Sequence, residues 1–227
     1  MKRARVVVLI SGGGTNLQAL MDASKHSDSA YDIVAVISNR PLAGGLDRAS
    51  QAGIKTHTLD HKAFPTRDAF DEALAAQIDA CAADFVACAG FMRVLTGAFV
   101  DRYEGRLINI HPSLLPSFKG LHTHARAIES GIAFTGCTVH WVNNGVDEGA
   151  IIGQAIVPIL PDDSPDALAH RVLAQEHRLY PLCLNLIAAG RLVLKDARSH
   201  LDGRPHTIAM MPDGAIVQHQ AGISETP

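Results

Sequence analysis

The amino-acid sequence predicts an α/β protein built on a Rossmann-like open sheet. Short runs rich in β-branched residues alternate with helical patterns, which is typical of βαβ units and a parallel sheet. The first run, Val6–Ile10, is apolar without interruption, as expected of a strand that is buried on both faces. Hydrophobic residues make up 47% of the 227 residues, a share that supports a sizeable core. We therefore expect a parallel core, a mixed C-terminal extension and helices on both faces of the sheet.

The elements of the first half follow in order along the chain. A helix is expected over residues 15 to about 24, and Ile33–Ile37 repeats the buried-strand pattern. Thr66 is a suitable N-cap for a second helix, because apolar side chains then recur every three or four residues. These side chains are Phe70, Ala73, Leu74 and Ile78. Phe85–Ala89 and Leu107–Ile110 are expected to form two further core strands.

From about residue 134 the pattern changes. Thr135–Val142 and Ile151–Ile159 have no clear helix between them, which favours a hairpin or a mixed extension of the sheet. Ser164-Pro165 then begins a helix with proline at its first position, and Pro181 is expected to kink or split that helix. Its apolar face consists of Leu168, Val172, Leu179, Leu182 and Leu186.

Composition excludes several classes of protein. The net charge of −3 leaves no broad basic surface for nucleic acid or an anionic membrane. No stretch approaches the ~20 apolar residues of a membrane span, and the apolar run behind the basic start is too short for a signal peptide. The four cysteines (Cys81, Cys88, Cys137 and Cys183) are not spaced as a zinc site or redox pair, which favours core residues in a reducing compartment. We therefore expect a cytoplasmic protein without nucleic-acid or membrane partners, as a monomer or a homodimer.

A glycine loop joins the first strand to the first helix at Ser11–Asn16. Its glycines permit a sharp turn, and the helix N-terminus and the side chains of Thr15 and Asn16 suit a phosphate. A dinucleotide-binding loop would need glycine or alanine at Leu17 and an acidic residue after the second strand, and neither is present. We expect a single phosphate monoester as the ligand, and an ordinary tight turn is the alternative.

Asn109 and His111 stand at the end of a predicted central strand. Their spacing of two places both side chains on one face, and Pro112 keeps His111 extended. Open α/β sheets bind ligands at this edge, where an amide beside an imidazole can stabilise an oxyanion and move a proton.

Asp147 is a candidate partner for His111. It lies in a loop with glycines at 145 and 149, and the conformational freedom of these glycines could bring the Asp147 carboxylate back to the His111 imidazole. A carboxylate in that place orients the imidazole and raises the pKa of the imidazole. The alternative is a turn-forming aspartate and an ordinary histidine, because the chain has 12 histidines.

Three other patterns in the sequence carry weaker signals. Residues 90–95 follow a strand and could line a pocket for a flat heterocycle, with core packing as the alternative. His122 and His124 have no Cys, Glu or Asp at a matching spacing, so no metal is expected. No serine stands in a nucleophile elbow, which leaves serine-hydrolase chemistry without support.

Together these segments resemble the folate-dependent formyltransferases. The resemblance runs from Val6 to about Gly203 and rests on residues 8–18, 37–40, 89–95, 109–116, 120–124 and 147–152. The Asn-x-His pair with a later Asp is shared by the wider formyl-handling group. The glycine loop and Gly120–His124 point to the branch that acts in purine biosynthesis.

The resemblance implies an activity and its residues. The formyl group of 10-formyltetrahydrofolate would move to the amine of 5'-phosphoribosylglycinamide, without a metal. The implied catalytic residues are Asn109, His111 and Asp147. The implied phosphate and ribonucleotide residues are Gly14, Thr15, Asn16 and Glu176. The implied folate residues are Arg67, Met92, Arg93, Val94, Leu95, Asn143, Asn144 and Val146, together with Asn109 and Asp147.

The resemblance also implies a domain organisation. Residues 1–203 would be the catalytic domain, with a nucleotide-binding half at about 1–105 and a folate-binding and catalytic half at about 106–203. Residues 204–227 would be a tail, in which weak strands are expected around Ile208 and Ile216. Gly13 and Lys119 depart from residues frequent in the family and could shift substrate affinity.

Three alternatives remain. Formyltetrahydrofolate deformylase would use the same trio with water as the nucleophile, but that family carries an extra N-terminal domain and lacks Gly120–His124. Methionyl-tRNA formyltransferase needs a C-terminal domain and a basic face for tRNA, which this chain is too short and too acidic to supply. The third alternative is a non-catalytic domain that binds a phosphorylated metabolite.

Overall fold

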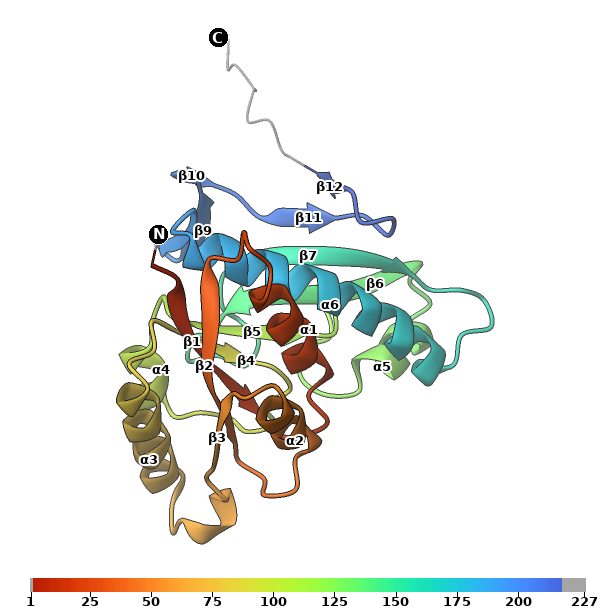
Figure 1. Ribbon diagram of the computed structural model, residues 1–227. Coiled ribbons are helices and arrows are strands. Elements are labelled where there is room, and N and C mark those ends of the chain that lie inside the picture. The colour runs from red at the N-terminus through yellow and green to blue at the C-terminus, as the bar shows by residue number, and fades with distance from the viewer. Residues whose placement is uncertain (1, 218–227) are drawn as a thin grey trace.

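The computed structural model describes residues 2–217 and contains a nine-stranded main sheet with helices on both faces (Figure 1). The order of its strands is β12-β11-β7-β6-β5-β4-β1-β2-β3. They are β1 (Ala4–Ile10), β2 (Tyr31–Ser38), β3 (Lys55–Thr58), β4 (Phe85–Cys88), β5 (Leu107–His111), β6 (Phe134–Trp141), β7 (Ile151–Pro158), β11 (Ile208–Met210) and β12 (Ile216–Val217).

A smaller sheet and the helices complete the described residues. The small sheet has three strands: β8 (Leu192–Lys195), β9 (Arg198–Leu201) and β10 (Arg204–Pro205). The helices are α1 (Thr15–Ser24), α2 (Gly44–Gln51), the 3-10 turn η1 (His61–Ala63), α3 (Arg67–Ala80), α4 (Gly97–Arg102), α5 (Thr123–Glu129) and α6 (Pro165–Ala188).

The strand directions confirm the predicted parallel core with a mixed C-terminal extension. Strands β3, β2, β1, β4 and β5 run parallel to one another. Strand β6 is antiparallel to both β5 and β7, so the predicted hairpin is confirmed. Strand β11 is parallel to β7, and β12 is antiparallel to β11.

Strand β1 is buried on both faces, as its uninterrupted apolar sequence predicts. Val6, Val8 and Ile10 pack in one cluster with residues of α1 and α6, whereas Val7 and Leu9 pack in a second cluster with residues of α3 and α4. Burial of each such side chain stabilises the fold by about 1.5–3 kcal/mol. This strand therefore separates two hydrophobic layers, and its C-terminal end is held firmly in place.

The start of α3 confirms the predicted cap. The Thr66 hydroxyl accepts a hydrogen bond from the Ala69 amide at 3.1 Å. Phe70, Leu74 and Ile78 are buried as expected, but Ala73 is only half-buried and a neighbouring alanine, Ala75, is buried in addition.

Helix α6 is the longest helix of the described residues, and Pro181 does not split it. The helix runs for 24 residues through Pro181, so the expectation of a split was wrong, and a kink at Pro181 stays a prediction. Proline removes one backbone hydrogen bond. However, Tyr180 and Leu184 on either side of it are fully buried against the sheet, and this packing outweighs the local preference.

Several short elements were not predicted from the sequence: α2, α4, α5, β3 and the small sheet. Strand β3 has the sequence Lys-Thr-His-Thr, lies at an edge and is largely exposed, so it carries no apolar alternation. Helices α4 and α5 have six and seven residues, which is too short for a periodic pattern to be recognised.

The C-terminal segment contributes to the main sheet. The weak strands expected around Ile208 and Ile216 are confirmed as β11 and β12. The division of the chain at residue 203 stays a prediction, and residues 218–227 of the expected tail lie outside the described residues. Within residues 2–217, no helix combines the length and the apolar character that a membrane crossing requires.

The cap of α6 leads to a stability prediction. The Ser164 hydroxyl accepts a hydrogen bond from the Ala167 amide at 3.1 Å. Replacement of such a cap by alanine costs about 1 kcal/mol, so Ser164→Ala is expected to lower the melting temperature by roughly 2–4 °C. Differential scanning calorimetry measures this shift. The control is Ser27→Ala, because Ser27 is exposed, and an equal shift in both variants would contradict the cap.

Candidate active site

Most of the predicted site residues lie where strands of the main sheet end, whereas Glu176 lies in α6 and Arg67 in α3. The glycine loop follows β1, the loop that contains Met92 follows β4, and His111 is the last residue of β5. Ser11 joins the first two loops, because its hydroxyl donates to Asn39 Oδ1 at 2.6 Å and accepts from the Met92 amide at 2.7 Å. The carboxyl edge of an open sheet is the usual ligand site of this architecture.

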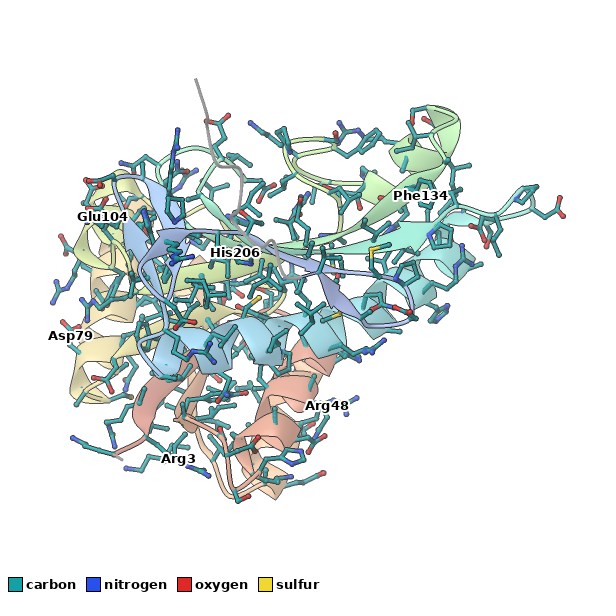
Figure 2. The ribbon with its side chains drawn as sticks, turned by 90° about the horizontal axis from the view of Figure 1, so that it is seen from above. Arg3, Arg48, Asp79, Glu104, Phe134 and His206 are labelled. Atoms are coloured by element: carbon teal, nitrogen blue, oxygen red, sulfur yellow. The ribbon has the colours of Figure 1, made fainter. Side chains whose placement is uncertain are left out.

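The glycine loop makes a close backbone approach that requires glycine. Gly14 has a φ of 73°, and a Cβ there would lie 2.7 Å from Gly45 Cα. The Gly45 amide donates to Gly12 O at 3.0 Å, and Arg48, which is labelled in Figure 2, donates from Nε to Gly13 O at 2.8 Å. Because Gly14 is the N-cap of α1 and has no side chain, the first amides of the helix have no side-chain cap.

Asn16 and Glu176 are brought together from distant parts of the chain. Asn16 Nδ2 donates to Glu176 Oε2 at 2.6 Å, which connects α1 to α6. Glu176 is only 7% exposed, and burial raises the pKa of its carboxyl against the opposing effect of the Asn16 hydrogen bond. Asn16 Oδ1 is buried without a hydrogen-bond partner. The structure therefore unites predicted ribonucleotide residues in one polar site.

His111 and Asp147 are in contact. His111 Nδ1 lies 3.3 Å from Asp147 Oδ2, and the exposed fraction of His111 is 5%. Asp147 Oδ2 also accepts from the Gly120 amide at 2.9 Å, and the backbone of Asp147 has a φ of 53°. His111 Nε2 lies 3.0 Å from the Phe118 carbonyl. Both ring nitrogens thus face oxygen acceptors, an arrangement that a ring with two N–H groups satisfies.

The glycine after this loop explains how the carboxylate returns to the imidazole. A Cβ at Gly149 would lie 1.6 Å from Trp141 O, so only glycine allows the loop backbone to pass this close to β6. A second ion pair, Lys119 Nζ with Glu148 Oε1 at 2.9 Å, joins the same loop to the segment after β5. Lys119, a departure from the family pattern, therefore takes part in a contact between two loops of the site.

His140 is a site residue that sequence reasoning missed. It lies opposite Asn109 in the β5–β6 pairing and is 2% exposed. Its Nε2 is 3.2 Å from Asn109 Nδ2 and 3.7 Å from Asp147 Oδ1, and burial lowers the pKa of its imidazole. The alternation of residues in β6 could have marked His140 as an inward-facing polar group, but only the strand register places it across from Asn109.

A third histidine lies near the pair. Burial, and secondarily the charge of His111, lower the pKa of His124, and its Nδ1 is buried without a hydrogen-bond partner. Within residues 2–217, no three His, Cys, Asp or Glu side chains gather as a metal site would require.

Most of the predicted folate residues lie in two loops, at 92–95 and 143–147. Met92, Val94 and Val146 expose large apolar surfaces, at 62%, 56% and 56%. Arg93 lies over the Phe70 ring at 4.4 Å, so its guanidinium is packed rather than solvated. The Asn143 side chain accepts a hydrogen bond from the Gly145 amide, and the Asn144 side chain donates one to Asp101.

Arg67 is not joined to this group. It is exposed in the first turn of α3, and the described side chains show no hydrogen bond or ion pair between Arg67 and the other predicted folate residues.

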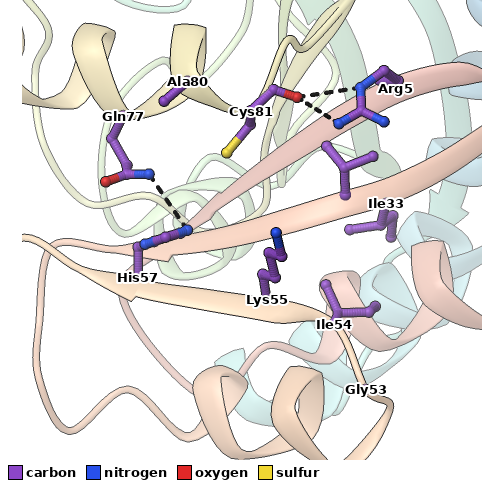
Figure 3. Close-up of a pocket in the computed structure, with 10 residues that line it drawn as sticks. Arg5, Ile33, Gly53, Ile54, Lys55, His57, Gln77, Ala80 and Cys81 are labelled. Atoms are coloured by element: carbon purple, nitrogen blue, oxygen red, sulfur yellow. Dashed lines mark hydrogen bonds between the residues drawn. The ribbon is translucent and has the colours of Figure 1, made fainter.

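One cavity lies away from this site. It has a volume of about 490 Å³ and is lined by residues of β1, β2, β3 and the end of α3 (Figure 3). It contains Arg5, Lys55, His57 and Gln77 but none of the predicted site residues. The cavity is therefore separate from the predicted site residues.

Comparisons with known proteins agree on one family. The model of the formyl transferase family matches residues 4–184. The chain is 50% identical to phosphoribosylglycinamide formyltransferase of Escherichia coli over 199 residues, which are 88% of this chain and 94% of the relative. It is 47% identical to the trifunctional purine biosynthetic protein adenosine-3 of Bos taurus, over 85% of this chain but only 19% of that protein.

A solved structure agrees with these relatives. The phosphoribosylglycinamide formyltransferase of Coxiella burnetii superposes with a TM-score of 0.87 at 46% identity. The superposition covers 94% of this chain and 98% of that one. The predicted Rossmann-like fold is thereby confirmed.

The crowding at Gly149 leads to a prediction about activity. Gly149→Ala is expected to displace the loop and lower turnover by about 10²-fold, because a shift of about 1 Å at a site has that effect. Steady-state kinetics measures the loss. Gly190→Ala is the control, since Gly190 has a φ of 71° but open space around its Cα. It should lose stability by backbone strain and keep its turnover; unchanged turnover in Gly149→Ala would contradict the role of the close approach.

The buried carboxyl of Glu176 leads to a prediction about pH. A carboxyl whose pKa is raised on folding binds more protons in the folded than in the unfolded state, so it reduces stability as pH rises above its unfolded value of about 4.3. Glu176→Gln is therefore expected to melt at a higher temperature than the wild type at pH 7–8, and the difference should vanish below about pH 4. Thermal unfolding across pH measures this. The control is Glu129→Gln, because Glu129 is exposed; a constant difference at every pH would contradict the burial argument.

Proposed function

The chain belongs to the formyl transferase family and transfers a formyl group in purine biosynthesis, and we propose that Asn109, His111 and Asp147 perform this transfer. The proposed donor is 10-formyltetrahydrofolate. The proposed acceptor is the amine of 5'-phosphoribosylglycinamide, and the products are formylglycinamide ribonucleotide and tetrahydrofolate. No metal is part of the proposal.

One observation carries the catalytic assignment. His111 Nδ1 lies 3.3 Å from Asp147 Oδ2, although 36 positions (147 − 111) separate the two residues along the chain. The pair is largely buried, His111 is the last residue of β5, and Asp147 lies in the same loop as the exposed Val146. A buried carboxylate–imidazole pair suits acid–base catalysis of a group transfer.

The glycine loop supports the acceptor side of the proposal. The uncapped amides at the start of α1 and the partial positive charge of a helix N-terminus favour a phosphate next to Gly14. Thr15 and Asn16 can add side-chain hydrogen bonds, and the carboxyl of Glu176 is an acceptor for a ribose hydroxyl. This arrangement would direct the amine of the ribonucleotide toward His111.

The loops at 91–95 and 143–147 support the donor side. Their exposed apolar side chains, Met92, Val94 and Val146, offer the surface that a flat heterocycle needs. Backbone groups of the same loops and the side chains of Asn143 and Asn144 would provide polar contacts. Arg67 has the weakest support, because it lies apart in the first turn of α3.

The proposed chemistry balances in atoms and protons. The acceptor amine attacks the formyl carbon, and a tetrahedral intermediate forms. Its oxyanion accepts hydrogen bonds from Asn109 Nδ2 and the protonated imidazole of His111. The bond from carbon to N10 of the folate then breaks, and one proton passes from the attacking nitrogen to N10.

Asp147 stabilises the charged imidazole in this scheme. The proton can travel through His111, through Asp147 or through a water held by Asp147. Because His111 Nε2 now bonds to the Phe118 carbonyl at 3.0 Å, the formyl oxygen would have to replace that carbonyl.

The alternatives are not favoured. The E. coli and C. burnetii relatives are both named formyltransferases, and the chain covers 94% and 98% of their lengths. A deformylase would release folate without a ribonucleotide, and a binding domain would release none. A cytoplasmic location stays part of the proposal, and so does the choice between monomer and homodimer.

Replacement of the pair tests the proposal. His111→Ala and Asp147→Asn are each expected to lower turnover by at least ~10²–10³-fold, the usual loss for one oxyanion donor. The assay mixes protein, glycinamide ribonucleotide and 10-formyltetrahydrofolate and follows the appearance of deformylated folate.

Two exposed residues supply matched controls. His26→Ala and Asp28→Asn should keep wild-type turnover. Near wild-type turnover in His111→Ala or Asp147→Asn, in a protein with an unchanged melting curve, would remove that residue from the mechanism. Folate release without the ribonucleotide would favour the hydrolase instead.

A further inference from the structure

We infer that His140 is a positioning residue that holds the Asn109 amide with one N–H group toward the formyl oxygen. The inference rests on the proposed role of Asn109 as an oxyanion donor. His140 lies on β6, directly opposite Asn109 on β5, and its side chain is almost completely buried. Directly opposed residues of antiparallel strands present their side chains on the same face.

Backbone contacts define which nitrogen of His140 carries the hydrogen. His140 Nδ1 lies 2.9 Å from the carbonyl oxygen of Trp141. A carbonyl only accepts, so Nδ1 must donate. Burial lowers the pKa of this imidazole, which keeps the ring neutral near pH 7. A neutral ring with hydrogen on Nδ1 has a lone pair on Nε2, and Nε2 is therefore an acceptor.

This lone pair selects one orientation of the Asn109 amide. Asn109 Nδ2 lies 3.2 Å from His140 Nε2, so one of its N–H groups donates to the ring. If the amide turned over, its oxygen would face the lone pair and the two would repel each other. The second N–H of Nδ2 is then left for the formyl oxygen. Among the described residues, this is the only hydrogen bond of the Asn109 side chain.

Asp147 also lies near His140 Nε2, but it does not form the hydrogen bond that Asn109 makes with this nitrogen. Its Oδ1 is 3.7 Å from His140 Nε2, beyond hydrogen-bond distance, whereas its Oδ2 is bonded to Gly120 N and faces His111. The Asp147 carboxylate thus pairs with His111, and the His140 imidazole accepts the hydrogen bond from Asn109. The two histidines have different proposed roles. His111 contacts the reacting atoms, whereas His140 acts only by orienting the Asn109 amide.

Two substitutions separate positioning from simple packing. His140→Gln keeps an acceptor, because its amide oxygen can accept from Asn109 while its nitrogen donates toward Asp147. His140→Met has similar bulk and only a weak acceptor. We expect His140→Met to lower kcat by about 10–100-fold, below the loss for complete removal of an oxyanion donor. KM for both substrates should change by less than about threefold, and His140→Gln should recover most of kcat.

A double-mutant cycle with Asn109→Ala is the decisive measurement. If His140 acts through Asn109, His140→Met should cause no further loss of kcat in the Asn109→Ala protein. Additive losses, or equal kcat values for His140→Met and His140→Gln, would overturn the inference. Wild-type turnover of Asn109→Ala alone would instead refute the proposed role of Asn109, so the two failures are distinguishable.

Controls address folding. His200 is also buried, is bonded through Nδ1 to a backbone carbonyl and lies on β9. His200→Met and His200→Gln should therefore have the same kcat. If His140→Met does not fold, His140→Asn replaces it, because its shorter amide can reach Trp141 O but not Asn109. Retention of wild-type kcat by a folded His140→Asn would overturn the inference as well.

Discussion

The contact between Asp147 and His111 is the interaction on which the proposed catalytic site depends. Strand β5 ends at His111, and β6 returns beside it before the chain turns through residues 143–149. The turn comes so close to β6 that a Cβ at Gly149 would overlap Trp141 O. A single missing side chain thus allows a carboxylate to reach an imidazole from a distant part of the sequence.

Trp141 connects this site to the C-terminal part of the protein. Its carbonyl accepts from His140, and its indole nitrogen donates to Ser199 Oγ at 3.2 Å. Ser199 in turn donates to the Ile151 carbonyl at 2.6 Å. The small sheet of β8–β10 therefore supports the strand that carries His140, although none of its residues lies at the site. Rigid support of this kind keeps catalytic groups in position.

Buried polar groups near the proposed site weaken the fold. The carboxyl of Glu176 has a raised pKa because it is buried, and Asn16 is its one hydrogen-bond donor among the described side chains. His140 and His124 have lowered pKa values for the same reason. The hydrophobic layers on both sides of β1 and the long helix α6 offset these costs. A substrate that satisfies such groups gains binding energy from them.

The sequence by itself determined the elements whose signals are local. Uninterrupted apolar runs identified the buried strands, and Thr66 and Ser164 identified helix starts, because caps and burial patterns depend on neighbouring residues. The residue types and the family resemblance also selected Asn109, His111 and Asp147. The tertiary structure alone decided the register of β5 against β6, the continuity of α6 through Pro181 and the place of His140. Register and packing join residues that are far apart in the chain, so no short window of sequence contains them.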